Sequence, residues 1–358
     1  MLIRSAKPMI LHLGILGGGN ISQTHMRAAL EIEGVKIAAV YGQNADKTRR
    51  LADSAGATVY THLDAFFSHR PMDAVLIGSP SGLHAEHGIA AARHGLHVLV
   101  EKPIDVTTER ADALIAACEI APVKLGVCFQ DRASSDIRNL KRVIDAGTLG
   151  KPILMSASVR WYRPPEYYKN SRWRGTWALD GGGALMNQGI HTVDLLLWLF
   201  GDVKSVWARA MTSLHEIEVE DTVVASFEFS GGAIGNLEAA TSAYPGLSRR
   251  IEMTWSQGTV VLENDRIRSA NLRKPIEGLC GEQSEEEDER AASPIVSDTR
   301  GHRAIIEDFI RAIVSDGVPL CDGYGARRSV ELVNAIYESS RTGLAVCITG
   351  GKGLAENV

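Results

Sequence analysis

The stretch Ile10-Leu11-His12-Leu13-Gly14-Ile15-Leu16-Gly17-Gly18-Gly19-Asn20-Ile21-Ser22 decides the fold of this chain. An apolar run of strand length leads into a glycine-rich turn, and a predicted helix follows. This order matches the Gly-x-Gly-x-x-Gly turn of a dinucleotide-binding βαβ unit, with Ser22 in the place of the last glycine. Glycines allow the tight turn and the close approach of a pyrophosphate to the helix N-terminus, where free N–H groups favour an anion. We therefore predict that the cofactor contacts Gly17, Gly19, Asn20 and Ile21.

Short strands and helices alternate through the first 130 residues. The predicted strands are Ile10–Gly17, Val35–Tyr41, Thr58–Tyr60, Ala74–Ser79, His97–Val100 and Val123–Phe129. The predicted helices are Ile21–Glu33, Ala45–Ala55, Leu63–His69, Leu83–His94, Thr108–Ile120 and Ser134–Ala146. This alternation predicts a Rossmann domain, over residues 1–130, with a doubly wound parallel sheet. The first strand also has the form of a weak signal peptide, but its direct continuation into the glycine turn favours the strand.

Strands follow one another after Gly150. They are predicted at Ile153–Arg160, Val203–Met211, Thr222–Phe229, Ala233–Thr241, Arg250–Trp255 and Gly258–Glu263. Turn residues separate them, which favours a large, open, mostly antiparallel sheet. We expect residues 131–358 to form a second α/β domain for substrate binding and oligomerisation. Its last helices, Arg303–Ser315 and Gly325–Thr342, are expected to pack back on the first domain.

Composition excludes several classes of protein. The 358 residues suit two domains, and the net charge of −5 without a basic stripe argues against nucleic acid. No apolar run reaches the ~18 residues of a membrane span. Five scattered cysteines without Cys-x-x-Cys spacing favour a reducing cytoplasm and no metal centre. The acidic segment over 281–290 is expected to be a solvated loop.

The cofactor's ribose end is predicted about twenty residues after the glycine turn. An acid there would bind the ribose 2′-hydroxyl and favour NAD. Gly42 and Gln43 occupy this place, and Lys47, Arg49 and Arg50 follow. Space and nearby cations favour NADP over NAD. The alternative is that these cations lie on the outer face of a helix, which leaves NAD open.

Two further segments end predicted parallel strands, where ligands bind in such sheets. One is Ser79-Pro80-Ser81-Gly82-Leu83-His84, and the other is Glu101-Lys102-Pro103. Ser79, Pro80, His84, Glu101 and Lys102 are therefore predicted to line the cofactor site. For His84, a helix-capping role is the alternative.

A third segment, Gly181-Gly182-Gly183-Ala184-Leu185-Met186-Asn187-Gln188-Gly189-Ile190-His191-Thr192-Val193-Asp194, precedes an apolar helix. Residues four apart share a helical face, so Asn187 and His191 are expected to point into one cleft and contact substrate. The alternative is a glycine-rich turn with His191 hydrogen-bonded in the core.

Glu-Lys-Pro together with Gly-Gly-Gly-x-x-x-x-x-Gly-x-His-x-x-Asp resembles the glucose–fructose oxidoreductase, inositol dehydrogenase and MocA (Gfo/Idh/MocA) family. The resemblance implies hydride exchange between NAD or NADP and a hydroxyl carbon of a sugar, sugar acid, cyclitol or related glycoside. It also implies a homodimer or homotetramer. Lys102 matches the family's catalytic lysine, Pro103 a proline that often follows a cis bond, and His191 the acid/base histidine.

The chemistry of these residue types agrees with the implied roles. Histidine can accept the hydroxyl proton near neutral pH, while an ammonium group stabilises the developing negative charge. Lys102 is itself an alternative base if burial lowers its pKa. Many members of the family carry aspartate where this chain has Asn187. Because an amide cannot shuttle a proton, Asn187 is expected to orient a substrate hydroxyl or hold His191.

The segment from Arg160 to Trp177 is rich in arginine and aromatic residues. Aromatic faces and guanidinium groups suit sugars and anions, so we predict that Arg163 and Trp173 contact a carboxylate, sulfonate or nucleotide-linked sugar. A surface loop or subunit contact is the alternative.

Two competing functions stay open at this point. A redox-neutral cycle would cleave a glycosidic bond by transient oxidation, and sugar release with only trace cofactor would distinguish it. A catalytically silent NAD(P)-binding sensor needs neither Lys102 nor His191, so their presence argues against it, although Asn187 favours it.

Overall fold

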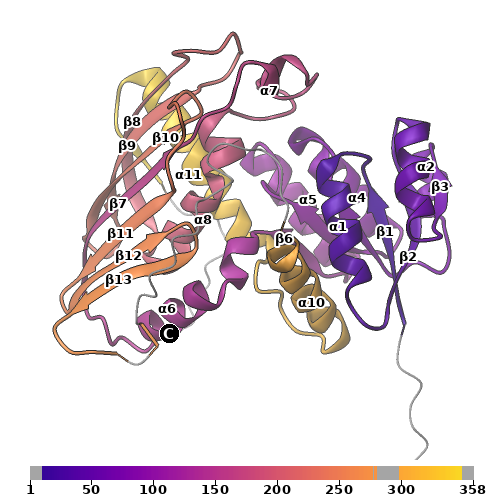
Figure 1. The fold of residues 1–358 in the computed structure, drawn as a ribbon, viewed down its shortest axis with the longest axis horizontal. Helices are drawn as coiled ribbons and strands as arrows, with labels where there is room; N and C mark the ends of the chain where they lie inside the picture. Colours follow the sequence, from indigo (N-terminus) through magenta and orange to yellow (C-terminus); the bar gives the residue numbers. More distant parts are fainter. Residues whose placement is uncertain (1–9, 277, 280–297, 349–358) are drawn as a thin grey trace, which may run out of the picture.

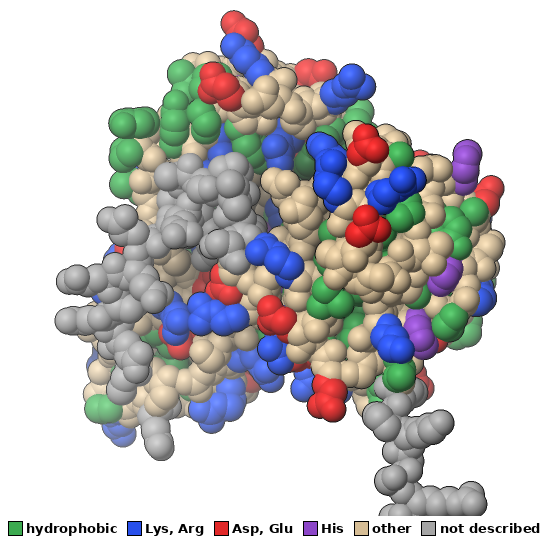
Figure 2. Space-filling view, turned by 45° about the vertical axis from the view of Figure 1, so that its right-hand side comes forward, with side chains coloured by type: hydrophobic (Ala, Val, Ile, Leu, Met, Phe, Trp, Pro, Cys, Tyr) green, Lys and Arg blue, Asp and Glu red, His purple; other side chains and the backbone are tan. Residues whose placement is uncertain are grey.

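Two sheets with their own helices make up the molecule (Figure 1). The structure, a computed structural model, describes residues 10–276, 278–279 and 298–348. The acidic segment over 281–290 therefore lies outside the described residues. On the face shown in Figure 2, basic and acidic side chains are interspersed over the described residues.

The first sheet is parallel and doubly wound, as predicted. Its order is β3-β2-β1-β4-β5-β6, formed by Thr58–Tyr60, Val35–Tyr41, Leu11–Leu16, Ala74–Ile77, His97–Glu101 and Leu125–Cys128. Its helices are α1 (Asn20–Leu30), α2 (Ala45–Asp53), α3 (Leu63–Phe67), α4 (His84–Arg93) and α5 (Thr108–Ile120). Every residue of β4 is buried, as expected for a central strand covered on both faces. The order reverses beside β1, which places a ligand crevice at the carboxyl ends of β1 and β4.

The second sheet is open and mostly antiparallel, which confirms the predicted fold class. Its order is β13-β12-β11-β7-β10-β9-β8-β14, formed by Arg266–Leu272, Gly258–Glu263, Arg250–Trp255, Pro152–Arg160, Ile234–Ala240, Thr222–Phe229, Val203–Met211 and Val346–Cys347. Only the β7–β10 pair is parallel among the named strands. Burial alternates along β9, so one face packs on the core and the other meets solvent.

The sequence analysis missed β13 and β14. In β13, Arg266 and Arg268 are exposed and Ile267 is the one fully buried side chain, so no clear apolar alternation marks the strand. In β14 only two residues pair with β8. Tertiary pairing, rather than local pattern, defines both strands.

The helices of the second half join the two sheets. They are α6 (Ser135–Asp145), α7 (Glu166–Lys169), α8 (Ile190–Leu199), α10 (Arg300–Val314) and α11 (Gly323–Thr342). Beside α8, the Phe200 ring packs on Phe229 and Trp255 of the sheet, at 4.9 and 5.4 Å between ring centroids. In Figure 1, α11 lies between the halves, in contact with β8 and α8 on one side and α5 on the other. Helix α10 packs against α1 and β5. The domain boundary near residue 130 stays a prediction.

None of the helices over the described residues is long and apolar enough to cross a membrane.

A buried ion pair fixes α8 against the segment that follows β6. Arg132 donates from Nε and Nη2 to the two carboxylate oxygens of Asp194, at 2.8 and 2.6 Å. Ser329 of α11 also donates to Asp194, at 3.3 Å. The side chains of Arg132 and Asp194 are 5% and 1% exposed, so each buried charge needs the other to compensate it.

Removing the Asp194 carboxylate should therefore destabilise the fold strongly. Asp194→Ala leaves the Arg132 guanidinium buried and uncompensated, at an expected cost of about 3–5 kcal/mol in the free energy of unfolding. Urea titration measures this. Asp112→Ala is the matched control, since Asp112 pairs with Arg327 at the surface and its removal should cost less than about 1 kcal/mol. Equal costs for the two variants would contradict the assignment.

Candidate active site

The glycine-rich turn after β1 has the geometry that a pyrophosphate needs. Gly17 has a φ of +131°, where a side chain would be strained and its Cβ would lie 2.7 Å from the carbonyl oxygen of Gly78. Gly19 caps the N-terminus of α1, and a Cβ there would meet no protein atom within 4 Å. The free N–H groups at the start of α1, which begins with Asn20 and Ile21, therefore face open space. Ser22 is fully buried, which lets α1 pack closely on the strands.

The predicted ribose end is close-packed at Gly42. A Cβ on Gly42 would collide with the hydroxyl of Thr48, so the position is sterically restricted to glycine. Gln43 and Lys47 are exposed near the start of α2, as are Arg49 and Arg50. This exposure agrees both with cations that bind a 2′-phosphate and with the outer face of a helix, so the preference for NADP over NAD stays a prediction.

His84 joins the ends of β4 and β5. Its Nδ1 lies 2.7 Å from the carbonyl oxygen of Pro103, and its Nε2 lies 2.9 Å from that of Ser79. The Lys102–Pro103 bond is cis, as the family resemblance implied. Because both ring nitrogens bond to backbone, the geometry favours His84 as a brace for the loops that begin at Ser79-Pro80 and Lys102, rather than as a direct ligand of the cofactor.

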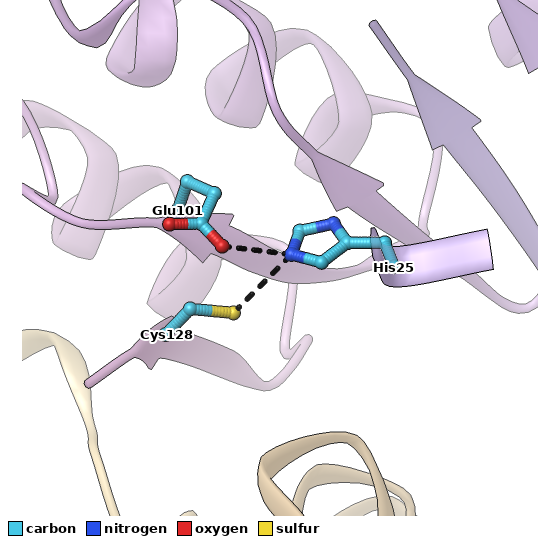
Figure 3. A group of neighbouring side chains, drawn as sticks. All are labelled: His25, Glu101 and Cys128. Atoms are coloured by element: carbon cyan, nitrogen blue, oxygen red, sulfur yellow. Dashed lines mark hydrogen bonds and ion pairs between the residues drawn. The ribbon is translucent and has the colours of Figure 1, made fainter. Parts of the chain in front are cut away.

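Glu101 points into a buried polar cluster behind this loop (Figure 3). Its Oε1 accepts a hydrogen bond from His25 Nε2 at 2.8 Å, and His302 Nε2 lies 3.5 Å away. Burial alone would raise the pKa of Glu101, but the hydrogen bonds from His25 and His302 hold it well below its usual value. The other carboxylate oxygen accepts the backbone N–H of Lys102 at 3.2 Å. Glu101 therefore holds α1, α10 and the start of the lysine loop together.

The same cluster contains the one group of potential metal ligands found among the described residues, His25, Glu101 and Cys128. Burial raises the pKa of the Cys128 thiol well above its usual value, and the nearby Glu101 charge raises it further. A metal needs the thiolate. The printed contacts of this group are the hydrogen bonds of a brace, and the expected lack of a metal centre stays a prediction.

The lysine and the third segment do meet. Lys102 Nζ donates to the backbone carbonyl of Asn187 at 2.7 Å. Burial lowers the pKa of Lys102, while Glu101 and Asp180 oppose the shift. The segment before α8 is a π-helical turn over Ala184–Gly189 instead of the expected α-helical run, and such turns are frequent at functional sites. That Asn187 and His191 point into one cleft stays a prediction.

His191 is held as a neutral imidazole. Its ring packs edge-on against Phe129, and its Nδ1 lies 3.8 Å from Asp131 Oδ2. Burial lowers the pKa of His191 to about 3, with further lowering by the cations of Lys102 and Arg249 against the opposing charge of Asp131. At neutral pH the imidazole is therefore uncharged, and one of its ring nitrogens bears no proton.

Sequence reasoning missed two buried acids at the site, Asp131 and Asp180. Asp131 follows β6 directly, so the rule that ligands lie at the carboxyl ends of parallel strands could have found it. It forms an ion pair with Arg249. Asp180 precedes the three glycines, and no spacing in the sequence distinguishes it from a loop residue.

On the predicted substrate side, Arg163 and its neighbours have different surroundings. Arg163 is buried and donates a hydrogen bond to Gln188 Oε1 at 2.9 Å, so its guanidinium binds another part of the protein. Trp173 is half-buried, and the guanidinium of Arg174 lies 5.4 Å from its ring centroid and 4.2 Å from that of Tyr167. No salt bridge to Arg174 occurs within the part of the chain that the structure describes. Arg174 is thus a candidate anion contact beside Trp173.

Substitution of Gly19 tests the pyrophosphate site directly. Gly19→Ala meets no protein atom, so the melting temperature should be unchanged. The added methyl group enters the space in front of α1 and should weaken NADH binding by about 10- to 100-fold, the effect of losing a charge-assisted hydrogen bond. Fluorescence titration measures the affinity. Gly231→Ala, in a distant turn with only ordinary contacts, is the control; wild-type affinity in Gly19→Ala would place the pyrophosphate elsewhere.

Comparison with known proteins gives the family. Residues 11–129 match the model of the oxidoreductase family with an NAD-binding Rossmann fold, and residues 137–261 match the GFO/IDH/MocA C-terminal domain. Inositol 2-dehydrogenase 3 of Saccharopolyspora erythraea is 30% identical over 262 residues, which cover 71% of this chain and 73% of the relative. The D-xylose 1-dehydrogenase (NADP(+)) 2 of Haloferax volcanii is 26% identical and covers 93% of this chain and 98% of the relative.

A solved structure extends the similarity over almost the whole chain. The WlbA dehydrogenase of Bordetella pertussis, in complex with NADH and UDP-GlcNAcA, superimposes with a TM-score of 0.87 at 30% identity. The match covers 96% of this chain and 99% of that one. With both family domains in order on the same fold, this chain belongs to the Gfo/Idh/MocA family of NAD(P)-dependent oxidoreductases.

Proposed function

We propose that this oxidoreductase transfers a hydride between NAD(P) and a hydroxyl carbon of a carbohydrate-type substrate that carries an acidic group. The observation that carries the proposal is the hydrogen bond from Lys102, at the carboxyl end of β5, to the carbonyl of Asn187 in the segment that leads to the neutral imidazole of His191. The related WlbA dehydrogenase, whose structure contains NADH and UDP-GlcNAcA, supports the substrate class.

The residues divide the proton chemistry between them. Bound NAD(P)+ supplies the hydride acceptor. His191 Nδ1 faces Asp131, so Nε2 is the atom that takes the hydroxyl proton of the substrate. The Asp131 carboxylate then stabilises the imidazolium charge. Lys102 Nζ, held by the carbonyl of Asn187, stabilises the negative charge that develops on the substrate oxygen. In the reverse direction His191 returns the proton.

Arg174 supports an acidic substrate. Its guanidinium stacks on Tyr167 and lies beside Trp173 in the loop that precedes the π turn. A planar guanidinium can bind a carboxylate through two parallel hydrogen bonds, and the aromatic rings can pack on a sugar. These side chains therefore favour a sugar acid, free or nucleotide-linked, over a neutral cyclitol.

The test is nicotinamide absorbance at 340 nm during incubation with sugars, sugar acids, cyclitols and sugar nucleotides. Acidic substrates should give the highest kcat/KM, because Arg174 pairs with the carboxylate. Each substrate is run with NAD and with NADP, and the lack of an acid at Gly42 with the exposed Lys47 nearby favours NADP.

Two variants serve as controls for this assay. Lys102→Ala should abolish the signal, and His191→Asn should lower turnover by about 10²- to 10⁴-fold while NADH still binds. Unchanged turnover in His191→Asn would remove its acid/base role. Sugar release with only trace cofactor would instead support the redox-neutral cycle.

The outer face of the second sheet is proposed as the contact in a homodimer or homotetramer. Leu154, Trp207, Val224 and Ile234 are each about half exposed on four adjacent strands, β7, β8, β9 and β10. An exposed apolar surface of this kind usually marks a site of contact with another protein chain. Light scattering should give a multiple of the 38.7 kDa subunit mass, and Ile234→Lys should lower it. A single-subunit mass would contradict the proposal.

A cytoplasmic location belongs to the same proposal, because Cys118, Cys128 and Cys321 are buried as free thiols. Cell fractionation checks it.

A further inference from the structure

We propose that Asp180 is a positioning residue of the active site. It fixes Asn187, which holds the Lys102 ammonium, and it places near that ammonium a negative charge that the amide of Asn187 lacks. This inference rests on the proposed hydride-transfer function. Many members of the family carry aspartate at the place of Asn187, and in this chain a carboxylate is instead bonded to that amide.

The first support is the hydrogen-bond geometry of Asp180. The residue is fully buried, and its Oδ2 accepts the backbone N–H of Gly175 at 2.8 Å. Its Oδ1 accepts a hydrogen bond from Asn187 Nδ2. The opposite side of the amide, Asn187 Oδ1, accepts from Gln188 Nε2 at 2.8 Å. The amide is thus held in one orientation from both sides.

The second support is the position of Asn187 between Asp180 and the lysine. While its side chain bonds to Asp180, its backbone carbonyl accepts the Lys102 ammonium at 2.7 Å. Asp180 is also among the charges that oppose the lowering of the Lys102 pKa. Asp180 therefore acts on Lys102 in two ways, by fixing the residue that holds the ammonium and by favouring its charged form.

The groups that face Asp180 come from every element packed against it. Lys102 lies at the end of β5, and Arg174 lies in the loop before Asp180. The remaining titratable neighbours are phenols, namely Tyr167 and Tyr168 of α7 and Tyr337 of α11. The cations of Lys102 and Arg174 lower the pKa of Asp180, but burial outweighs them and raises it to about 6.

A pH profile separates this role from a merely structural one. Below pH ~6 Asp180 takes up a proton, so the negative charge beside Lys102 is lost and the hydrogen bond from Asn187 is no longer charge-assisted. The kcat of the wild type should therefore fall below about pH 6. Loss of neutral His191 cannot explain such a fall, because its pKa lies near 3.

The experiment compares four variants with the wild type. Asp180→Asn should lower kcat about 10- to 100-fold at pH 7.5, the effect of losing one charge-assisted hydrogen bond, and should abolish the acid limb near pH 6. Asn187→Asp places two carboxyl groups in contact, so the pair retains a proton and activity falls. The double variant Asp180→Asn/Asn187→Asp restores one acid and one amide, and should recover most of the activity. Glu218→Gln, an exposed acid that accepts the N–H of Trp177, should behave as wild type.

A second readout requires no substrate. The acylation rate of Lys102, followed by mass spectrometry over a range of pH, reports its pKa. In Asp180→Asn this pKa should fall below that of the wild type, because an opposing negative charge is gone. Thermal unfolding and NADH titration establish that each variant is folded.

The two readouts distinguish the role of Asp180 from the proposed hydride-transfer function. An unshifted Lys102 titration in Asp180→Asn, or a double variant no more active than Asp180→Asn alone, would overturn the role of Asp180. A wild type that turns over no substrate would instead count against the proposed function, and the Lys102 titration would still decide the role of Asp180.

Discussion

The desolvated ammonium of Lys102 is the constraint around which this site is arranged. Removing a cation from water favours its neutral form, and a neutral amine could not stabilise a substrate oxyanion. The protein opposes that loss with a carbonyl 2.7 Å from Nζ and with three carboxylates in the neighbourhood, those of Glu101, Asp131 and Asp180. The same cation lowers the pKa of His191 and so helps to keep a base available beside an acid. His191 thus stays neutral mainly because it is buried, and the Lys102 charge adds to that effect.

The carboxylates that compensate Lys102 come from different parts of the chain. Glu101 ends β5, Asp131 follows β6, and Asp180 lies in the loop before the π turn. Each is fixed by another contact, with His25, Arg249 and Gly175 respectively. The site is therefore assembled at the junction of the two sheets, where α8 and α11 join the halves (Figure 1). Neither half contains a complete set of charges.

Much of the fold could be predicted because local sequence patterns indicate it. The boundaries of Thr108–Ile120, Val203–Met211 and Thr222–Phe229 agree with the structure, since apolar periodicity and turn residues delimit them. The glycine turn and the lysine segment were found from the rule for parallel strands. The π turn and the Asp180–Asn187 bond could not be found, because the hydrogen bonds of a π turn leave no periodic trace and Asp180 looks like any loop acid. The side-chain partners of Arg163 likewise depend on tertiary packing.

The brace around Glu101 has a consequence for protein synthesis. The first 130 residues contain every strand of the parallel sheet, yet one of the two histidines that stabilise the Glu101 carboxylate, His302, belongs to α10. On the ribosome, the early part of the chain can form its sheet long before α10 emerges. Until then Glu101 has only His25 as a histidine partner, and α1 lacks the helix that packs against it. The nucleotide-binding half therefore acquires its final electrostatics only after the chain has been translated beyond α10.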